Sequence, residues 1–329
     1  MARARALVEP ALRAAVNELD DERMRLIARY QLGWCDQHGN PTSSGGKAIR
    51  PTLAVLSAQA GGGQPDAGVP AAVAVELVHN FSLLHDDVMD RDLERRHRPT
   101  GWAAFGEGQA ILAGNAMLTA AAQVLLGDGP AGARALPCLL DATQRLISGQ
   151  SEDLVFERQA AITLDGVIRM EAGKTGALLS CAASIGALAV GAPAPVVEAL
   201  ASFGLDLGMA FQFVDDVLGI TGDPEVTGKS ASSDVRAGKR SAPVVAALSA
   251  GTEQSRQLAG LLAAGPPQTE EEVALAARLI VDAGGVDWAT READARLSAA
   301  LAALDAVELP AEARDDLIAM GRFVVNRDY

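Results

Sequence analysis

Three aspartates, Asp86, Asp87 and Asp90, close a long apolar stretch of the chain. On a helix, Asp86 and Asp90 lie on one face one turn apart, and Asp87 lies about 100° round from Asp86. Like charges this close repel one another, and hard divalent cations with oxygen ligands neutralise such clusters. The spacing therefore predicts a metal site at a helix end. The alternative is a solvated acidic helix end held by ion pairs.

Two further features favour the metal site. Arg95 and Arg96 follow the acids, and guanidinium groups beside carboxylates suit a metal-bridged phosphate. A second apolar run ends in Asp215 and Asp216, which repeats the same design. If the two helix ends faced each other, they would form one cleft with two metal-binding walls.

The lysines are few, and their positions are informative. Four stand against 24 arginines. A compact ammonium serves phosphate sites as a point charge, so we expect most of the four to bind phosphate. A coding bias towards arginine with chance placement is the alternative. The four are Lys47, Lys174, Lys229 and Lys239.

The elements that must position these groups read as helices throughout. About half of the residues are hydrophobic, aromatic residues are few, and no period-2 run of β-branched residues stands out. We expect one all-α domain over residues 1–329, with about a dozen helices. The predicted helices cover residues 4–36, 47–59, 71–90, 109–126, 133–150, 151–158, 164–190, 195–219, 242–250, 252–264, 270–283, 285–304 and 310–327. Loops are expected at 39–46, 91–101 and 127–132, and a polar loop at 227–238 could act as a lid over a phosphate site.

Composition narrows the partners and the compartment. A net charge of −14 argues against nucleic acid and anionic membranes, although metals can still bring an anionic substrate to the site. Three cysteines without metal spacing indicate a reducing cytosol. No signal peptide is expected, and the most apolar run, 177–190, is shorter than a bilayer needs, so a core helix is expected there.

With these features in place, the chain resembles the trans-isoprenyl diphosphate synthases, the family of farnesyl and geranylgeranyl diphosphate synthases. The resemblance runs from about residue 40 to about 245 and rests on ordered motifs. These are Gly45 to Pro51, the Asp86 to Arg96 stretch, Gly173-Lys174-Thr175, Asp215 to Gly219, Thr227-Gly228-Lys229 and Asp234 to Lys239.

The resemblance implies a helical bundle with a central active-site cavity, the isoprenoid synthase fold. It implies that an allylic diphosphate loses pyrophosphate and that the cation is attacked by isopentenyl diphosphate, with pyrophosphate expected to accept the proton. Mg²⁺, three ions by the resemblance, would neutralise the leaving group. The expected metal ligands are Asp86, Asp87, Asp90 and Asp215, with Asp216 next in line.

The resemblance also assigns roles to the basic and neutral polar groups. Lys174, Lys229 and Lys239 would add fixed charge at the leaving diphosphate, and Arg95 would grip it. The second diphosphate would be held by Lys47, Arg50, His79 and Arg96. Thr175 and Gln212 would stabilise the cation through neutral oxygens. For His79, the alternative is a buried, hydrogen-bonded histidine, and His85 is expected to support the acid pair without binding substrate.

Product length is predicted from the residues below the first acids. Phe81 lies about 7.5 Å before Asp86 along the helix axis, and its neighbour Ser82 is small. One aromatic beside a small residue resembles the geranylgeranyl (C20) type more than the farnesyl type. The alternatives are that Phe81 only packs in the core, and that the product is farnesyl (C15) or longer. His97 and Asn115 depart from the family pattern, where Gly and Asp are usual, and Gly219 removes one possible metal ligand.

Two alternatives of a different class stay open. A terpene cyclase shares the first acid motif, and a non-catalytic partner subunit would bind prenyl diphosphates or another subunit. The second Asp pair, with Lys47 and Arg50 for a second diphosphate, favours the synthase. The resemblance further implies a homodimer in the cytoplasm with no transmembrane segment.

Overall fold

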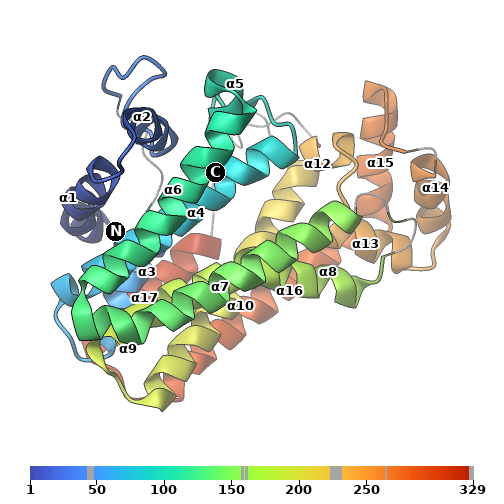
Figure 1. Cartoon of the computed structure of the whole chain (residues 1–329). Helices are drawn as coiled ribbons and strands as arrows, with labels where there is room; N and C mark the ends of the chain where they lie inside the picture. Colours follow the sequence, from blue (N-terminus) through green and yellow to red (C-terminus); the bar gives the residue numbers. More distant parts are fainter. Residues whose placement is uncertain (43–47, 157–158, 160–161, 223–231, 264, 326–329) are drawn as a thin grey trace. The chain divides into compact units, whose positions relative to one another are not determined.

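A computed structural model describes residues 1–42, 48–156, 159, 162–222, 232–263 and 265–325 (Figure 1). Helices dominate it, and the predicted all-α class is confirmed. Within the residues that the structure describes, the one sheet is a short hairpin of β1 (Glu94–Arg95) and β2 (Arg98–Pro99).

The chain divides into two compact units, each built from separate stretches of sequence. The first comprises Met1–Thr143, Leu178–Gly204 and Ala303–Met320, and the second comprises Gln144–Ala177, Leu205–Ala302 and Gly321–Tyr329. The boundaries fall inside α7 (Gly129–Phe156), α9 (Ala177–Val190), α10 (Ala194–Thr221), α16 (Gly285–Asp305) and α17 (Ala311–Val325). The prediction of one domain over residues 1–329 stays a prediction.

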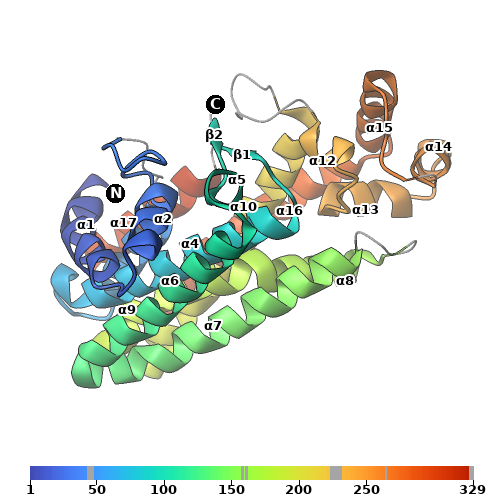
Figure 2. The ribbon, with the colours of Figure 1, turned by 45° about the horizontal axis from the view of Figure 1, so that its top comes forward.

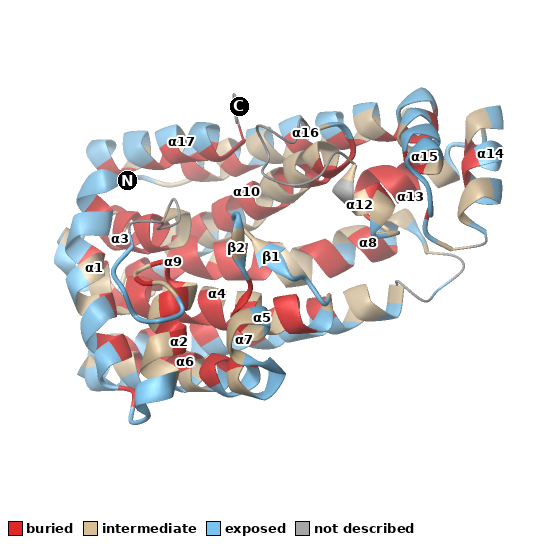
Figure 3. Cartoon of the chain, turned by 90° about the horizontal axis from the view of Figure 1, so that it is seen from above, coloured by how far each residue is buried: buried red, intermediate tan, exposed pale blue. Residues whose placement is uncertain are grey.

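The first unit is organised around α4 (Val69–Met89), which packs along α6 (Glu107–Gly127) (Figure 2). Helix α4 also packs against α3 (Ile49–Ala60). Its side chains are buried or half-buried almost all round, with only Met89 exposed, so α4 is a core helix with the acid cluster at its end (Figure 3). Four further helical elements that the structure describes lie wholly in this unit: α1 (Ala2–Asn17), α2 (Glu22–Gln31), η1 (Pro65–Gly68) and α5 (Gly101–Phe105).

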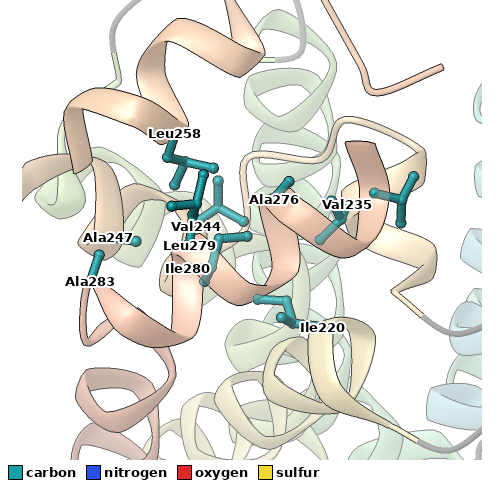
Figure 4. Packing of buried hydrophobic residues seen from close by; sticks show 10 residues of the cluster. Ile220, Val235, Val244, Ala247, Leu258, Ala276, Leu279, Ile280 and Ala283 are labelled. Atoms are coloured by element: carbon teal, nitrogen blue, oxygen red, sulfur yellow. The ribbon is translucent and has the colours of Figure 1, made fainter. Parts of the chain in front are cut away.

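The second unit holds two apolar cores. One joins Met170 of α8 (Leu164–Glu171) to Phe213 of α10, whose ring meets Trp288 edge to face at 5.7 Å between centroids. The other gathers Val244, Leu258 and Leu279 (Figure 4). This second core includes residues of α12 (Ser233–Arg236), α13 (Ala242–Ser249), α14 (Glu253–Leu262) and α15 (Glu270–Asp282). Elsewhere in the unit, a π-helical turn, η2 (Ala172–Gly176), follows α8. Thr252 and Thr269 close capping boxes at the starts of α14 and α15.

Several predicted boundaries were wrong. The expected helix over 4–36 breaks into α1 and α2, because Asp21 caps α2 by accepting from the backbone N–H groups of Arg23 and Met24. The expected turn at 127–132 shrinks to Asp128, and α7 runs unbroken to Phe156. The loop at 91–101 contains the hairpin. Of the loop predicted at 227–238, residues 227–231 lie outside the described residues, and the remainder contains the short helix α12.

Four helical stretches are long and apolar enough to cross a membrane, by length and composition alone. They are Pro65–Met89, Glu107–Gly127, Leu164–Val190 and Ala194–Thr221. The length argument drawn from 177–190 was therefore wrong, since that run continues a longer helical stretch. In the first and third of these stretches, 61% and 67% of the most apolar window is buried inside the protein itself. That burial fits core helices, and the expected absence of a transmembrane segment stays a prediction.

Candidate active site

The first acid cluster lies at the C-terminal end of α4. Asp86 and Asp87 stand in its last turn, and Asp90 is its C-cap. The hairpin brings Arg95 back to this end, where its Nε donates to Asp87 Oδ1 at 2.6 Å and its Nη2 lies 3.5 Å from Asp86 Oδ2. The structure therefore pairs the predicted metal ligands with a predicted diphosphate ligand.

Asp87 is the most buried of these carboxyls, with 1% of its side chain exposed. Burial raises its pKa to about 6, although the charge of Arg95 and its hydrogen bond act to lower it. Asp87 Oδ2 is buried and has no hydrogen-bond partner among the described residues. A buried carboxylate oxygen without a donor is a position that a cation can fill.

The hairpin turn explains one departure from the family pattern. Arg96 and His97 join β1 to β2 and both have left-handed backbones, with φ of 54° and 59°. This conformation suits glycine, which has no Cβ. The usual Gly at position 97 thus has a backbone reason, and His97 adopts the same conformation at a cost in strain.

A cationic group lies further along the same unit. Arg50, in the first turn of α3, approaches His79 of α4, with 3.3 Å between Nη1 and His79 Nε2. Arginine can only donate, so His79 Nε2 accepts. Burial and the charges of Arg50, Arg96 and Arg95 hold the pKa of His79 well below its usual range. His79 is thus a neutral acceptor that orients Arg50.

Sequence reasoning missed Glu76, one turn before His79. Its Oε1 accepts from Asn80 Nδ2 at 3.0 Å. Burial raises its pKa, while the charges of Arg50 and Arg96 lower it. Its spacing of three residues before His79 was the available signal. Lys47, predicted to join this group, lies outside the described residues.

The predicted chain-length residues lie on α4 next to His85. Phe81 is buried, and its ring meets that of His85 edge to face at 4.9 Å between centroids. His85 Nε2 lies 3.0 Å from the Ile111 carbonyl oxygen, and a Cβ at Gly114 would approach this ring nitrogen to 2.4 Å. Ser82 Oγ donates to the His79 carbonyl. Asn115, the other departure, is exposed on α6.

In the second unit, the π-helical turn presents Lys174 and Thr175. Lys174 Nζ lies 2.5 Å from Asp153 Oδ2 of α7, a partner that the sequence did not reveal. The approach of α7 to the π turn needs a residue without a side chain, since a Cβ at Gly149 would lie 2.3 Å from the Lys174 backbone nitrogen. Asp153 holds this lysine and partly offsets its charge.

Thr175 leads into a connected set of polar groups. Its Oγ1 donates to Gln212 Oε1 at 2.7 Å, and Gln212 Nε2 donates to Asp216 Oδ1 at 2.7 Å. Asp216 Oδ2 accepts from the Ala242 backbone N–H at 3.1 Å. Hydrogen bonds thus connect three predicted site residues, Thr175, Gln212 and Asp216, and the last of these is buried.

Asp216 also meets Glu171, a second buried carboxyl that sequence reasoning missed. Only 4% of Asp216 and 3% of Glu171 are exposed. Burial raises the pKa of Asp216 to about 7. Burial and then the Asp216 charge raise the pKa of Glu171 well above its usual range, which favours the neutral form of this carboxyl beside Asp216.

Asp215 is half-buried on α10 next to Asp216. Gly219, one turn later, faces Asp234, because a Cβ at Gly219 would lie 2.2 Å from Asp234 Oδ2. The missing side chain at 219 thus makes room for another carboxylate. The Lys239 backbone N–H donates to the Asp234 carbonyl, and Lys229 lies outside the described residues.

Within the parts of the chain that the structure describes, no three His, Cys, Asp or Glu side chains form a ready metal-binding group. Mg²⁺ nevertheless suits the donors present, because it keeps several waters and binds through one or two carboxylates plus phosphate oxygens. The buried, unpartnered Asp87 Oδ2 fits that demand. The two acid motifs lie in different units, so their sharing of one metal cluster stays a prediction.

Comparison with known proteins decides the family. Residues 34–280 match the family model described as polyprenyl synthetase. The chain belongs to the polyprenyl synthetase family. A (2E,6E)-farnesyl diphosphate synthase of Mycobacterium tuberculosis is 43% identical over 98% of this chain and 91% of its own. A geranylgeranyl diphosphate synthase of the same organism is 43% identical over 99% and 93%.

Solved structures of polyprenyl synthetases agree with the fold. A polyprenyl synthetase from Streptomyces coelicolor is 48% identical, with a TM-score of 0.94 over 99% of this chain and 98% of its own. A geranylgeranyl pyrophosphate synthase from Corynebacterium glutamicum, complexed with isoprenyl diphosphate and magnesium, is 27% identical with a TM-score of 0.86 over 98% and 97%. The predicted isoprenoid synthase fold is confirmed, and the chain is a trans-prenyltransferase.

Proposed function

We propose that this chain condenses isopentenyl diphosphate head to tail with an allylic diphosphate, in a Mg²⁺-dependent reaction that ends at geranylgeranyl diphosphate. The observation that carries the chemistry is the pairing of Arg95 with Asp86 and Asp87, next to the Arg50–His79 group, in one unit. Carboxylates for cations on α4, and guanidiniums for phosphates brought to α4 by the hairpin and by α3, then stand in one unit, as a reaction between two diphosphates requires.

Mg²⁺, with three ions expected, would be held by Asp86, Asp87 and Asp90 in the first unit and by Asp215 in the second. The bound ions would neutralise the leaving diphosphate. Magnesium and isoprenyl diphosphate in the related Corynebacterium structure support this assignment. Diphosphate oxygens compete with Asp87 for the Arg95 guanidinium, so Arg95 can turn from the carboxylate to the substrate. Arg50, oriented by neutral His79, then serves the second diphosphate as a bidentate donor.

In the second unit, Lys174 is held by Asp153 and offers a fixed ammonium to the allylic diphosphate. Thr175 and Gln212 offer neutral oxygens to the developing cation. Lys47, Lys229, Lys239 and Arg96 complete the proposed diphosphate ligands.

The C20 product is proposed from Phe81 and Ser82. Phe81 is fixed by the His85 ring, and His85 in turn is held at the Ile111 carbonyl. A single fixed aromatic with a serine beside it would leave more depth below the acids than two adjacent aromatics. Relatives named for C15 and for C20 products match equally well in identity, so the proposed C20 product rests on Phe81 and Ser82.

A homodimer is proposed through α6. This helix has one charged residue, Glu107, yet Leu112 and Leu126 are 54% and 62% exposed. An uncharged, partly apolar face on a chain of net charge −14 suits a second copy, because burying it leaves no charge unpaired. We also propose a cytoplasmic location.

The test is the substrate requirement of the purified protein with Mg²⁺. Condensation needs both isopentenyl diphosphate and dimethylallyl, geranyl or farnesyl diphosphate, and omission of either abolishes it. Turnover of the allylic diphosphate alone to a cyclic hydrocarbon would instead identify a cyclase. A well-folded protein that converts neither mixture would support a partner subunit and overturn the proposal.

A further inference from the structure

Asp216 is buried and hydrogen-bonded to its neighbours, although its position in the second acid motif suggests a metal ligand. Its neighbour Asp215 is half-buried, whereas only 4% of Asp216 is exposed. Both Asp216 oxygens already accept hydrogen bonds, from Gln212 Nε2 and from the Ala242 backbone N–H. A metal would have to reach the remaining lone pairs of a carboxylate that is buried and held by these two bonds.

These hydrogen bonds fix which way the Gln212 amide points. The Ala242 N–H can only donate, and it anchors the Asp216 carboxylate. The other carboxylate oxygen then takes the amide nitrogen of Gln212, which leaves the amide oxygen for Thr175. An amide turned the other way would set two acceptors, Asp216 Oδ1 and Gln212 Oε1, against each other.

The orientation is passed on to Thr175. Because Gln212 presents its amide oxygen, the Thr175 hydroxyl donates its one proton to that oxygen. The lone pairs of the Thr175 oxygen, the negative end of the O–H dipole, then point away from Gln212. An oxygen so polarised is arranged in advance to stabilise positive charge, such as that of an allylic cation.

Glu171 completes the support. It is 3% exposed, lies three residues before Lys174 in the chain and is hydrogen-bonded to Asp216. The core around Met170 and Phe213 holds α8 against α10, and this packing keeps the Glu171 and Asp216 carboxyls at fixed positions relative to Gln212. Buried networks of this kind orient the groups they contact.

We propose that Asp216 is a positioning residue that, supported by Glu171, sets the polarity of Gln212 and Thr175 and does not bind the metal. The inference rests on the proposed function for its chemical meaning. Asp215 alone would then carry the metal role in this motif.

A double-mutant cycle in the condensation assay tests the coupling. Asp216→Asn and Thr175→Val are each expected to lower kcat about tenfold or more, with the KM for isopentenyl diphosphate changed less than about twofold. The double variant is expected to be no slower than the slower single variant, since both changes remove the same polarised oxygen. Multiplying effects would overturn the inference.

Metal affinity gives a readout independent of turnover. Binding of Mn²⁺ in the presence of inorganic pyrophosphate is followed by electron paramagnetic resonance. Asp216→Asn is expected to leave the dissociation constant within about twofold, while Asp215→Asn weakens binding about tenfold or more. Equal weakening in both variants would make Asp216 a metal ligand and overturn the inference.

Asp206→Asn is the matched control. Asp206 lies on the same helix and pairs with Arg296 at 2.9 Å, outside this hydrogen-bonded set, so kcat should not change. If Asp216→Asn does not fold, Asp216→Ser, which keeps an acceptor for Ala242, takes its place in both experiments. If the wild-type protein does not condense, the proposed function fails, yet the Mn²⁺ titration still decides whether Asp216 binds metal.

Discussion

The pairing of Arg95 with the first acid cluster predicts how the metal-free protein responds to loss of that arginine. Arg95→Gln removes a charge-assisted hydrogen bond of 2.6 Å to a carboxyl that is 1% exposed. Hydrogen bonds to charged groups contribute roughly 1.5–3 kcal/mol, so we expect a loss of about 2 kcal/mol at pH 8. For a chain of 329 residues, whose unfolding entropy is about 0.7 kcal/mol/K, that is a fall in Tm of about 3 °C.

The loss should depend on pH in a defined direction. Burial raises the pKa of Asp87 to about 6, and Arg95 acts to lower it, so the variant has a still higher value. Below about pH 5, Asp87 is protonated in both folded proteins, and the difference in stability shrinks. As the pH rises through 6, the wild-type carboxyl ionises beside Arg95 while the variant's resists, so the difference grows.

Thermal unfolding by circular dichroism at pH 5 and pH 8 measures this difference. Arg91→Gln is the control, because Arg91 pairs with Glu107 at the surface with both side chains about half or more exposed, and its removal should cost little. Added Mg²⁺ should stabilise Arg95→Gln more than wild type, since the carboxylates are no longer shared. If Arg95→Gln and Arg91→Gln unfold at the same temperature at pH 8, the reasoning is refuted.

Three further predictions address other residues. Burial raises the pKa of Asp216 from 3.8 to about 7, so the stability of the wild type relative to Asp216→Asn should fall by up to about 4 kcal/mol as the pH rises from about 4 to 7. A free-energy difference between the two proteins that stays constant over that pH range, measured by urea unfolding, would contradict this. His97→Gly should stabilise the protein by up to about 1 kcal/mol, because it relieves a backbone φ of 59°, and a lower Tm would argue against strain there. Phe81→Ala should lengthen the product beyond C20, as measured by sizing the dephosphorylated alcohols, and an unchanged length would show that Phe81 only packs.

The sequence predicted the parts of the site that local patterns encode. The apolar run of α4 and the three aspartates at its end placed the acid cluster at a helix end, where the structure has it. The second Asp pair lies on a helix for the same reason. Helical class, too, follows from composition and periodicity, which act over a few turns.

The partners of these residues could not be predicted in the same way. Asp153 and Lys174 lie 21 residues apart, and Gln212 reaches back to Thr175, so their pairing depends on how distant helices pack. The π-helical turn at Ala172–Gly176 and the continuity of α7 likewise depend on tertiary contacts, which override local propensity at Gly149. Glycines at close helix approaches were the one available signal.

The most direct test is extension of farnesyl diphosphate by the purified protein with labelled isopentenyl diphosphate, with and without Mg²⁺. We predict one Mg²⁺-dependent addition that yields a dominant C20 alcohol after dephosphorylation, and no product with metal removed. Accumulation of a C15 alcohol from shorter starters, with farnesyl diphosphate left unused, would contradict the C20 assignment. No condensation with any starter would contradict the account as a whole.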